Sequence, residues 1–309
     1  MKELDTRRVS REKRGHVLLI GLDRVAKRNA FDLDLLNELS LAYGEFEADS
    51  DARVAVVFGH GEHFTAGLDR VAKRNAFDLD LLNALSLAYG EFEADSEARV
   101  AVVFAHGEHF TAGLDLVNAS VALADGWQVP PGGCDPWAVF AGPRVSKPVI
   151  VAAQGYCLTI GIELMLAADI NLCASNTRFA QKEVQRGIFP FGGATLRLHQ
   201  VAGWGNAMRW LLTGDEFDAH DALHLGLVQE IMASEDLLPR ALELAERIAR
   251  QAPLGVQATL MSARQARYEG EMAAAQALPA LVKTLLNSED AKEGVLSMVE
   301  KRPGIFKGV

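Results

Sequence analysis

The chain has 309 residues, of which 49% are apolar and 23% are charged, a composition typical of a soluble globular protein of one or two domains. The formal net charge is −10 and the pI is near 5.3, which argues against a general nucleic-acid-binding protein. Any anionic ligand must therefore be held by a local cluster of basic residues.

The N-terminal segment, MKELDTRRVSREKRGH, is highly charged and contains no apolar core. It lacks the features of a secretory signal peptide, and we expect a cytoplasmic protein. Three cysteines (Cys134, Cys157 and Cys173) have no metal-type spacing, and two of them lie in apolar runs. They are predicted to be buried thiols in a reducing compartment.

The sequence contains a long internal repeat. Residues 21–66 recur as residues 67–112 at an offset of 46. The copies differ only at the pairs Glu38/Ala84, Asp51/Glu97 and Gly59/Ala105. Structural repeats normally diverge, and solenoids need three or more units to bury a continuous core. Two nearly identical copies instead favour a recent duplication, an engineered sequence or an assembly error.

Each copy predicts the same elements. The stretch KRNAFDLDLLNELSLAYGEFEAD is a loop followed by an amphipathic helix, because its apolar residues recur at helical spacing. ARVAVVF is a fully apolar strand, as expected for a sheet covered on both faces, and GHGEHFTAGLD is a glycine-rich loop. A lead-in strand, residues 16–22, precedes only the first copy, and a helix that starts at Leu116 follows only the second.

The histidines of these loops, His60 with His63 and His106 with His109, have a spacing that a metal pair could use. No third ligand occurs at a suitable spacing, so no metal site is predicted. The pair His220 and His224 lacks a third ligand for the same reason, and we expect both side chains to face solvent.

Residues 118–146 are irregular and rich in Gly, Pro and Trp. The segment is either a plain connecting loop or a loop that selects a ligand, and both interpretations stay open. The apolar run that follows, residues 148–153, predicts a buried strand. Gln154, Glu163 and Asp169 argue against a membrane span across this region.

Two isolated carboxylates stand out after this strand. Glu163 lies in an apolar helical stretch, and Glu183 follows the strand-like residues 170–174 and a short RFA segment. Removing an unpaired carboxylate from water costs several kcal/mol, so such residues are rarely buried without a function. The alternative, that Glu163 caps or salt-bridges its own helix, stays open.

The remaining chain is predominantly helical. TGDEFDAHDALHLGLVQEI predicts a helix with an acidic start that runs into a short strand, residues 227–231. Residues 237–251 and 257–281 are predicted as amphipathic helices, and EGVLSMVEKRPGIFKGV as a final helix and tail.

Four of these segments together resemble the crotonase (enoyl-CoA hydratase/isomerase) family: HFTAGLDL, GYCLTIGIELMLAADI, RFAQKEVQRGIFPFGGA and TGDEFDAHDALHLGLVQEI. The resemblance covers the chain from about Gly15 to its end. It implies an α/β fold, a crotonase-type spiral of ββα units with a helical C-terminal trimerisation region. The implied organisation is a charged tail (1–14), a spiral core (15–200) and a helical region (201–309).

The resemblance also assigns site residues. Glu163 and Glu183 match the two glutamates that straddle the substrate double bond in the family's hydratases. The oxyanion-hole peptides match the N–H groups of Leu114 (Leu68 in the first copy) and Ile160, where the family usually has Gly. Further residues implied to contact substrate are Ala112, Gly113, Asp115, Leu116 and Gly161.

By the same resemblance, the function is hydration of a 2-enoyl-CoA thioester by a homotrimer or a dimer of trimers. No metal or redox cofactor is expected, since coenzyme A is part of the substrate. Isomerisation, thioester hydrolysis and weak CoA-ester binding without catalysis remain alternatives. The basic residues expected at the CoA phosphates are Lys27-Arg28 or Lys73-Arg74, with Lys301, Arg302 and Lys307.

Removing one copy of the repeat leaves 263 residues, close to the usual size of a protomer of this family. One copy is therefore predicted to be surplus to the fold. The second should carry the site, because Leu114 is joined directly to the downstream helix. The surplus copy has an apolar helix face and an apolar strand. We expect it to dock on the protein, to swap into a neighbouring subunit or to promote aggregation.

Overall fold

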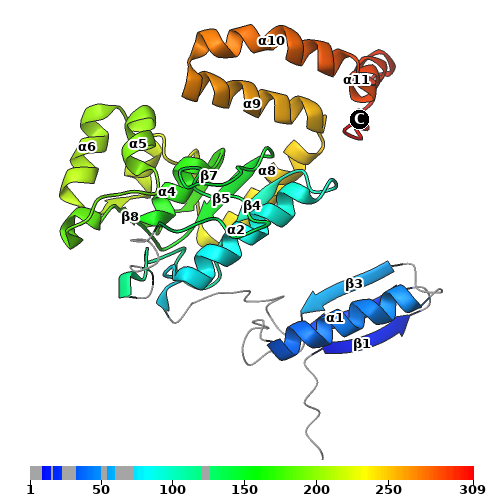
Figure 1. The fold of residues 1–309 in the computed structure, drawn as a ribbon, viewed down its shortest axis with the longest axis horizontal. Coiled ribbons are helices and arrows are strands. Elements are labelled where there is room, and N and C mark those ends of the chain that lie inside the picture. Colours follow the sequence, from blue (N-terminus) through cyan, green and yellow to red (C-terminus); the bar gives the residue numbers. More distant parts are fainter. Residues whose placement is uncertain are drawn as a thin grey trace, which may run out of the picture. The chain divides into compact units, whose positions relative to one another are not determined.

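A computed structural model of the chain describes residues 9–14, 17–22, 33–49, 54–59, 73–117, 119 and 126–309. The chain divides into two compact units, Met1–Arg70 and Val71–Val309 (Figure 1). The boundary lies close to the junction of the two copies. The first copy thus belongs entirely to the first unit, and all but the first four residues of the second copy belong to the second unit.

The first unit contains a three-stranded sheet in the order β1-β2-β3. Strand β1 (Val9–Arg14) runs antiparallel to β2 (Val17–Leu22), and β3 (Val54–Gly59) runs parallel to β2 on its other side. Helix α1 (Leu33–Ala48) connects β2 to β3 and contacts β1 and β2. The lead-in strand is therefore confirmed, whereas β1 lies in the segment that the sequence assigned to a charged tail.

Helix α1 holds β1 through one residue that differs between the copies. The Val9 N–H donates to the Glu38 carboxylate at 3.0 Å, and the Arg11 guanidinium donates to the Glu38 carbonyl at 2.8 Å. Lys13 forms an ion pair with Asp49 at 2.5 Å. The charged side chains of Arg11 and Lys13 thus find partners in the helix or directly after it, which helps to explain how so charged a strand is tolerated.

The second unit is built on a four-stranded parallel sheet in the order β10-β7-β5-β4. Its strands are β4 (Ala101–Val103), β5 (Val149–Ala153), β7 (Ile170–Ala174) and β10 (Glu230–Met232). Every residue of β5 is buried, which accounts for its continuous apolar sequence. A smaller sheet of β6 (Tyr156–Leu158), β8 (Arg178–Ala180) and β9 (Phe217–Asp218) lies in the order β6-β8-β9.

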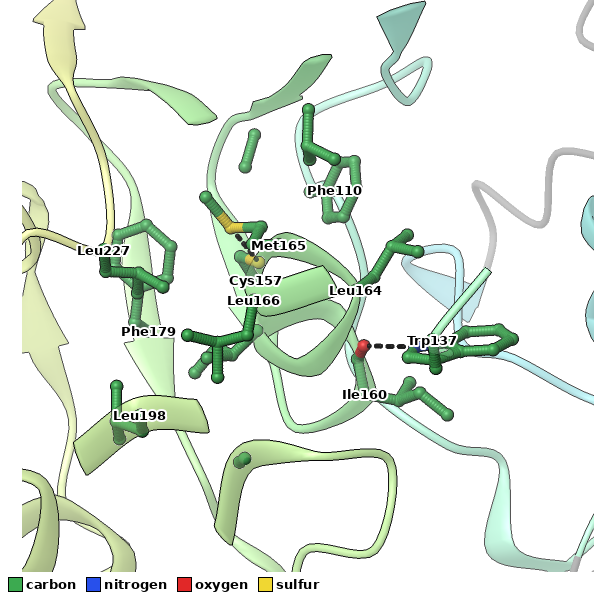
Figure 2. Packing of buried hydrophobic residues seen from close by; sticks show 14 of the residues in the cluster. Phe110, Trp137, Cys157, Ile160, Leu164, Met165, Leu166, Phe179, Leu198 and Leu227 are labelled. Atoms are coloured by element: carbon green, nitrogen blue, oxygen red, sulfur yellow. Dashed lines mark hydrogen bonds between the residues drawn. The ribbon is translucent and has the colours of Figure 1, made fainter. Parts of the chain in front are cut away.

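Helices and buried aromatic residues enclose these sheets. Helix α2 (Leu79–Ala94) begins at Asp78, whose carboxylate accepts the Leu81 N–H at 3.0 Å. The central helix is α4 (Ile160–Ala167), all of whose residues are buried (Figure 2). The others around the sheets are η3 (Glu183–Arg186), α5 (Ala194–Ala202), α6 (Trp204–Thr213), α7 (Ala219–His224) and α8 (Ser234–Ala249). The three cysteines are free and buried, as predicted.

The C-terminal region corrects one prediction. Residues 257–281 do not form one helix, because Gly270 adopts φ 96° and separates α9 (Pro253–Glu269) from α10 (Glu271–Leu286) (Figure 1). Glycine reaches this conformation without steric cost, so the chain can turn there. Arg264 of α9 donates to the Val145 carbonyl at 2.7 Å and pairs with Asp169 at 3.0 Å, which fixes the helix to the sheet region.

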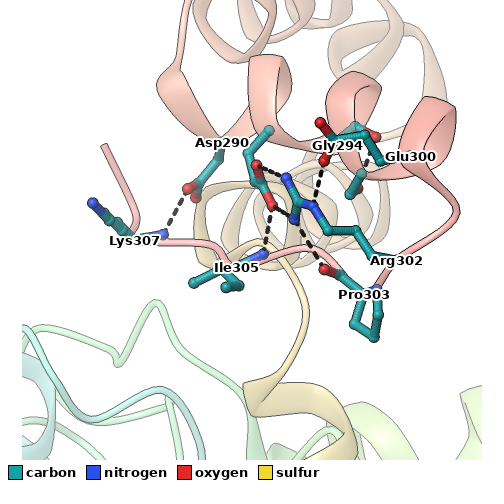
Figure 3. Close-up of polar contacts among 9 residues, drawn as sticks. Asp290, Gly294, Glu300, Arg302, Pro303, Ile305 and Lys307 are labelled. Carbon is teal, nitrogen blue, oxygen red and sulfur yellow. Dashed lines mark hydrogen bonds and ion pairs between the residues drawn. The ribbon is translucent and has the colours of Figure 1, made fainter.

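Helix α11 (Glu289–Glu300) and the tail end the chain, and polar contacts fold the tail back on the helix (Figure 3). Arg302 forms ion pairs with Glu293 and, at 2.6 Å, with Glu300. The Lys307 N–H donates to Asp290 at 2.7 Å. No helix in the described part of the chain is long and apolar enough to cross a membrane.

Candidate active site

The first candidate carboxylate, Glu163, lies in the first turn of α4 and is 2% exposed. Its Oε1 accepts the Ala194 N–H at 3.1 Å, at the start of α5. A Cβ at Gly192 would lie 2.5 Å from its Oε2, so only glycine permits this close approach. The carboxylate therefore bonds to the positive end of another helix rather than capping its own.

Burial is the dominant influence on this group. It raises the pKa of Glu163 to about 7, while hydrogen bonds from the Ala194, Gly192 and Gly193 peptides and the charge of Arg197 lower it. A carboxylate that would be fully ionised in water is thus brought close to half-protonation at neutral pH.

The second carboxylate, Glu183, begins η3 directly after β8 and is 5% exposed. Burial and then the charge of Glu163 raise its pKa to about 8. The charge of one glutamate therefore acts on the titration of the other. The side chain of Gln181 is buried next to Glu183. With its amide oriented to donate, its nitrogen lies 2.9 Å from Oε1 and 3.0 Å from Oε2 of Glu183.

A short bridge brings the two predicted oxyanion segments together. Thr111 pairs with Cys157 in parallel register, through Thr111 N–H to the Tyr156 carbonyl at 2.8 Å and Leu158 N–H to the Thr111 carbonyl at 3.1 Å. Two residues further along each segment, Gly113 lies against Thr159. A Cβ at Gly113 would overlap the Thr159 hydroxyl, and Gly113 has φ 96°. Glycine is therefore required there.

The peptides that follow these two residues carry the candidate donors. Leu114 is held on both sides, since Phe77 N–H donates to the Gly113 carbonyl at 2.8 Å and Asp115 N–H donates to the Phe77 carbonyl at 2.7 Å. Within the described ranges, neither the Leu114 N–H nor the Ile160 N–H has a hydrogen-bond acceptor. Two unpaired peptide donors thus belong to segments that are in contact.

The other predicted site residues near this contact differ in how deeply they are buried. Gly161 is buried, and a Cβ there would lie 2.5 Å from the Thr111 methyl group. Ala112 and Asp115 are partly buried in the same loop, whereas the Leu116 side chain is exposed. Leu68, the counterpart of Leu114 in the first copy, lies outside the described residues.

Sequence reasoning missed a buried network beside the site. The Trp137 indole N–H donates to the Ile160 carbonyl at 3.0 Å (Figure 2). Arg197 donates to the carbonyls of Trp137 at 2.7 Å and Ala138 at 2.9 Å. The Trp-rich composition of residues 118–146 was the available signal. It had suggested a ligand-selecting loop as one of two possibilities.

The predicted phosphate-binding cations lie on two separate segments of the described chain, at residues 73–74 and 301–307. Lys73, Arg74 and Lys301 are exposed, and Arg74 lies 5.5 Å from the centre of the Tyr156 ring. Arg302 is engaged in ion pairs, and Lys27 and Arg28 lie outside the described residues. In the part of the chain described, no group of three or more His, Cys, Asp or Glu is arranged to hold a metal ion. The His109 ring instead accepts the Tyr156 N–H at 3.1 Å.

One hollow of the described structure lies away from the glutamates. It has a volume of about 670 Å³ and lies between the segment 144–146 and helices α9 and α10. The carboxylate pair is instead enclosed, as the low exposure of both side chains indicates.

Comparisons with known proteins agree on one family. A family model described as enoyl-CoA hydratase/isomerase matches residues 68–309. An enoyl-CoA hydratase of Mycobacterium tuberculosis is 30% identical over 299 residues, 96% of this chain and 95% of that protein. A carnitinyl-CoA dehydratase of Escherichia coli K12 is 34% identical over 307 residues, with 96% and 97% covered.

Solved structures show the same similarity. The crystal structure of a probable enoyl-CoA hydratase/isomerase from Mycobacterium abscessus aligns with a TM-score of 0.74 and 42% identity, over 98% of this chain and 99% of that one. An enoyl-CoA hydratase from Mycobacterium marinum aligns with a TM-score of 0.70 and 27% identity, with the same coverage. The predicted fold class is confirmed by these alignments.

Proposed function

Because the chain belongs to the enoyl-CoA hydratase/isomerase family, we propose that it adds water across the double bond of a 2-enoyl-CoA thioester. The observation that carries the proposal is the pair of buried glutamates with raised pKa values, Glu163 and Glu183. The matched region, residues 68–309, contains both glutamates and the loop of the second copy.

The two unpaired peptide donors supply the electrostatic part of the mechanism. Adding water to an α,β-unsaturated thioester places negative charge on the thioester oxygen as an enolate forms. The N–H groups of Leu114 and Ile160 would stabilise that charge without rearrangement. Loss of one such donor typically costs about 3 kcal/mol of transition-state stabilisation.

The two glutamates have different roles in proton transfer, one as acid and the other as base. Hydration needs one ionised carboxylate to activate water and one protonated carboxyl to deliver a proton to the α-carbon. Glu183 is assigned as the acid, because burial and the charge of Glu163 both raise its pKa and favour its protonated form. Glu163, with a pKa of about 7, is assigned as the base that holds and activates the water. The scheme uses no metal or redox cofactor, since coenzyme A enters with the substrate.

A trimer or a dimer of trimers remains part of the proposal. Its support is the set of apolar side chains that the helices α10 and α11 leave exposed: Met272, Val282, Leu286, Val295, Met298 and Val299. Side chains of this kind are usually covered by another protein surface.

The proposal is tested by mixing the purified full-length chain with crotonyl-CoA. Hydration removes the conjugated double bond, so the enoyl absorbance should fall and the product should gain the mass of one water. Release of free CoA thiol would indicate a hydrolase instead, and conversion of a 3-enoyl-CoA to the conjugated 2-enoyl-CoA would indicate an isomerase. Binding with none of these reactions would indicate a CoA-ester-binding protein.

A further inference from the structure

Thr159 has a backbone conformation that β-branched residues rarely adopt. Its φ is 49° and its ψ is −112°, close to the first central position of a type II′ turn, where glycine is strongly preferred. Among the described non-glycine residues with positive φ, Thr159 is the β-branched one. Strain of this kind persists where the surrounding structure enforces it, and it concentrates at functional sites.

The backbone of Thr159 joins the segments of both glutamates. Its N–H donates to the Ala180 carbonyl at 2.8 Å, at the end of the strand that leads to Glu183. Its carbonyl accepts the N–H of Ile162 at 2.9 Å and of Glu163 at 3.2 Å. The strained residue is thus anchored on both sides and directly precedes the Ile160 peptide.

The side chain of Thr159 contacts the segment of the other donor. Its hydroxyl, Cβ and methyl group all surround the site where a Cβ at Gly113 would lie. Gly113, the residue directly before the Leu114 N–H, therefore packs against the Thr159 side chain. Through its backbone and its side chain, one residue adjoins both peptide donors.

The hydroxyl of Thr159 does not explain this arrangement by hydrogen bonding. Its Oγ1 is buried and has no hydrogen-bond partner among the described residues. A buried hydroxyl without a partner is unfavourable. The residue therefore contributes through its shape, which fills the space between the two segments.

We propose that Thr159 is a positioning residue that sets the separation and direction of the Leu114 and Ile160 N–H groups. This inference rests on the proposed function, because it assumes that these two groups bind the thioester oxygen. Thr159 acts on that oxygen only through the two peptides. Its local strain is the cost of a fixed donor geometry.

The test measures how strongly the protein polarises a bound thioester. The probe is a 2,4-dienoyl-CoA, whose absorbance shifts to longer wavelength when donors pull electron density toward the carbonyl oxygen. All binding measurements use the Glu183→Gln background, so that the probe is not consumed. Hydration of crotonyl-CoA is measured separately with Glu183 intact. Thermal unfolding is recorded for every variant.

Three substitutions at Thr159 separate the effects of its contact with Gly113, of its backbone strain and of its hydroxyl group. Thr159→Gly removes the contact but relieves the strain, so the shift and kcat should fall, kcat by at least ~10-fold, with KM changed less and Tm equal or higher. Thr159→Ala removes the contact and keeps the strain, so the shift and Tm should both fall. Thr159→Val keeps the shape and should restore most of the shift and kcat.

Each contrary outcome has a distinct meaning. A full shift and full kcat in Thr159→Gly would overturn the inference and leave the proposed function standing. Loss of the shift in a folded Thr159→Val variant would also overturn it, because the hydroxyl itself would then act on the substrate. Absence of any shift in the parent protein would overturn the proposed function, and this inference with it.

Discussion

The two copies of the repeat have nearly the same sequence, yet their equivalent residues lie in different surroundings. Tyr89 of α2 is 5% exposed, whereas Tyr43 of α1 is 45% exposed. A Cβ at Gly90 would overlap the Gly132 carbonyl oxygen, but no described residue lies within 4 Å of the same position at Gly44. Burial of this helix is therefore decided by the segments that follow it, which only the second copy possesses.

The strands differ in the same way. In the first unit, Ala55 of β3 is paired with Leu18 of β2. Its equivalent in the second unit, Ala101 of β4, is paired with Val149 of β5. One strand sequence thus forms a parallel ladder with two different partners. The apolar pattern therefore specifies a buried parallel strand but not the strand with which it pairs.

The largest expected effect is at the glutamates, which lie downstream of both copies. Replacing Glu163 or Glu183 by Gln keeps the side-chain shape and removes the acid or base, so hydration of crotonyl-CoA should fall by at least ~10²-fold. The control is Glu235→Gln at an exposed position, which should leave the rate unchanged. Near wild-type turnover in both glutamate variants would rule out the two-carboxylate mechanism.

The same substitution in each copy tests which one carries the site. Gly113→Ala introduces a Cβ that overlaps the Thr159 hydroxyl at a residue with φ 96°, which displaces the Leu114 donor. Hydration should fall by about 10²-fold, the usual effect of losing one oxyanion donor. The matched control is Gly67→Ala, 46 positions earlier and directly after the loop of the first copy, where the rate should stay within about 2-fold of wild type because no oxyanion donor is displaced. Equal losses in both variants would show that the first copy also serves the site.

The pH dependence follows from the raised pKa values. The pair titrates near 7 and 8, and the reaction needs one ionised and one protonated carboxyl group. The hydration rate should therefore peak between these values and fall about tenfold per pH unit on either side. A rate that stays flat over a range of about four pH units centred on this maximum would contradict this assignment.

The same carboxyl groups affect stability. Both folded-state pKa values lie above the ordinary value of 4.5, so the folded protein binds more protons than the unfolded chain. Their contribution to the free energy of unfolding is present at acidic pH and is lost as the pH rises through about 7 and 8. The double variant with Gln at both positions should lose this part of the pH dependence in a series of thermal unfolding curves.

The equivalent Gly→Ala substitution should change the stability of helices α1 and α2 in opposite directions. Gly90→Ala forces a side chain into the Gly132 backbone and should destabilise the second unit by about 1–3 kcal/mol. Gly44→Ala fills open space in a helix interior and should stabilise the first unit by about 0.5–1 kcal/mol. Hydrogen exchange of each helix measures the two effects separately. Shifts of the same sign would contradict the different surroundings of the two helices.

Local patterns predicted the elements that position the site. The apolar runs of β5 and β7 and the helical stretch of α4 were readable because burial on all sides leaves a continuous apolar sequence. Residues 257–281 were predicted as one helix because Gly270 interrupts the pattern at a single position. Its φ of 96° could not be read from the periodicity.

The supporting residues of the site depend on contacts between distant segments. Trp137 bonds to Ile160, 23 positions away, and Arg197 bonds to Trp137, 60 positions away. The contact between Thr159 and Gly113 likewise has no signal in the spacing of residues. Strand β1 was assigned to a tail because VSREKR has a polar composition. Its pairing with β2 and its bonds to Glu38 come from the fold.

Deleting residues 21–66 should leave an active protein, with the smallest expected change in rate. The junction then joins Ile20 to Gly67, so the lead-in sequence VLLIGL is restored and continues directly into the second copy. Both glutamates, the Gly113–Leu114 loop and Thr159 are retained. Crotonyl-CoA hydration should therefore stay within about 2–3-fold of the full chain, since nothing that touches the substrate is removed. Thermal stability should be equal or higher.

A second deletion tests whether the two copies are interchangeable. Deleting residues 67–112 instead joins Ala66 to Gly113, and the product differs from the first deletion only in having Glu38, Asp51 and Gly59 in place of Ala84, Glu97 and Ala105. If the surroundings decide the role of each copy, both shortened chains should adopt the same fold and hydrate crotonyl-CoA at similar rates. In that case the first copy, once joined to Gly113, occupies the place that the second copy has in the full chain. If both deletions prevent folding, as judged by circular dichroism and size-exclusion chromatography, each copy is structurally necessary. The prediction of one surplus copy would then be wrong.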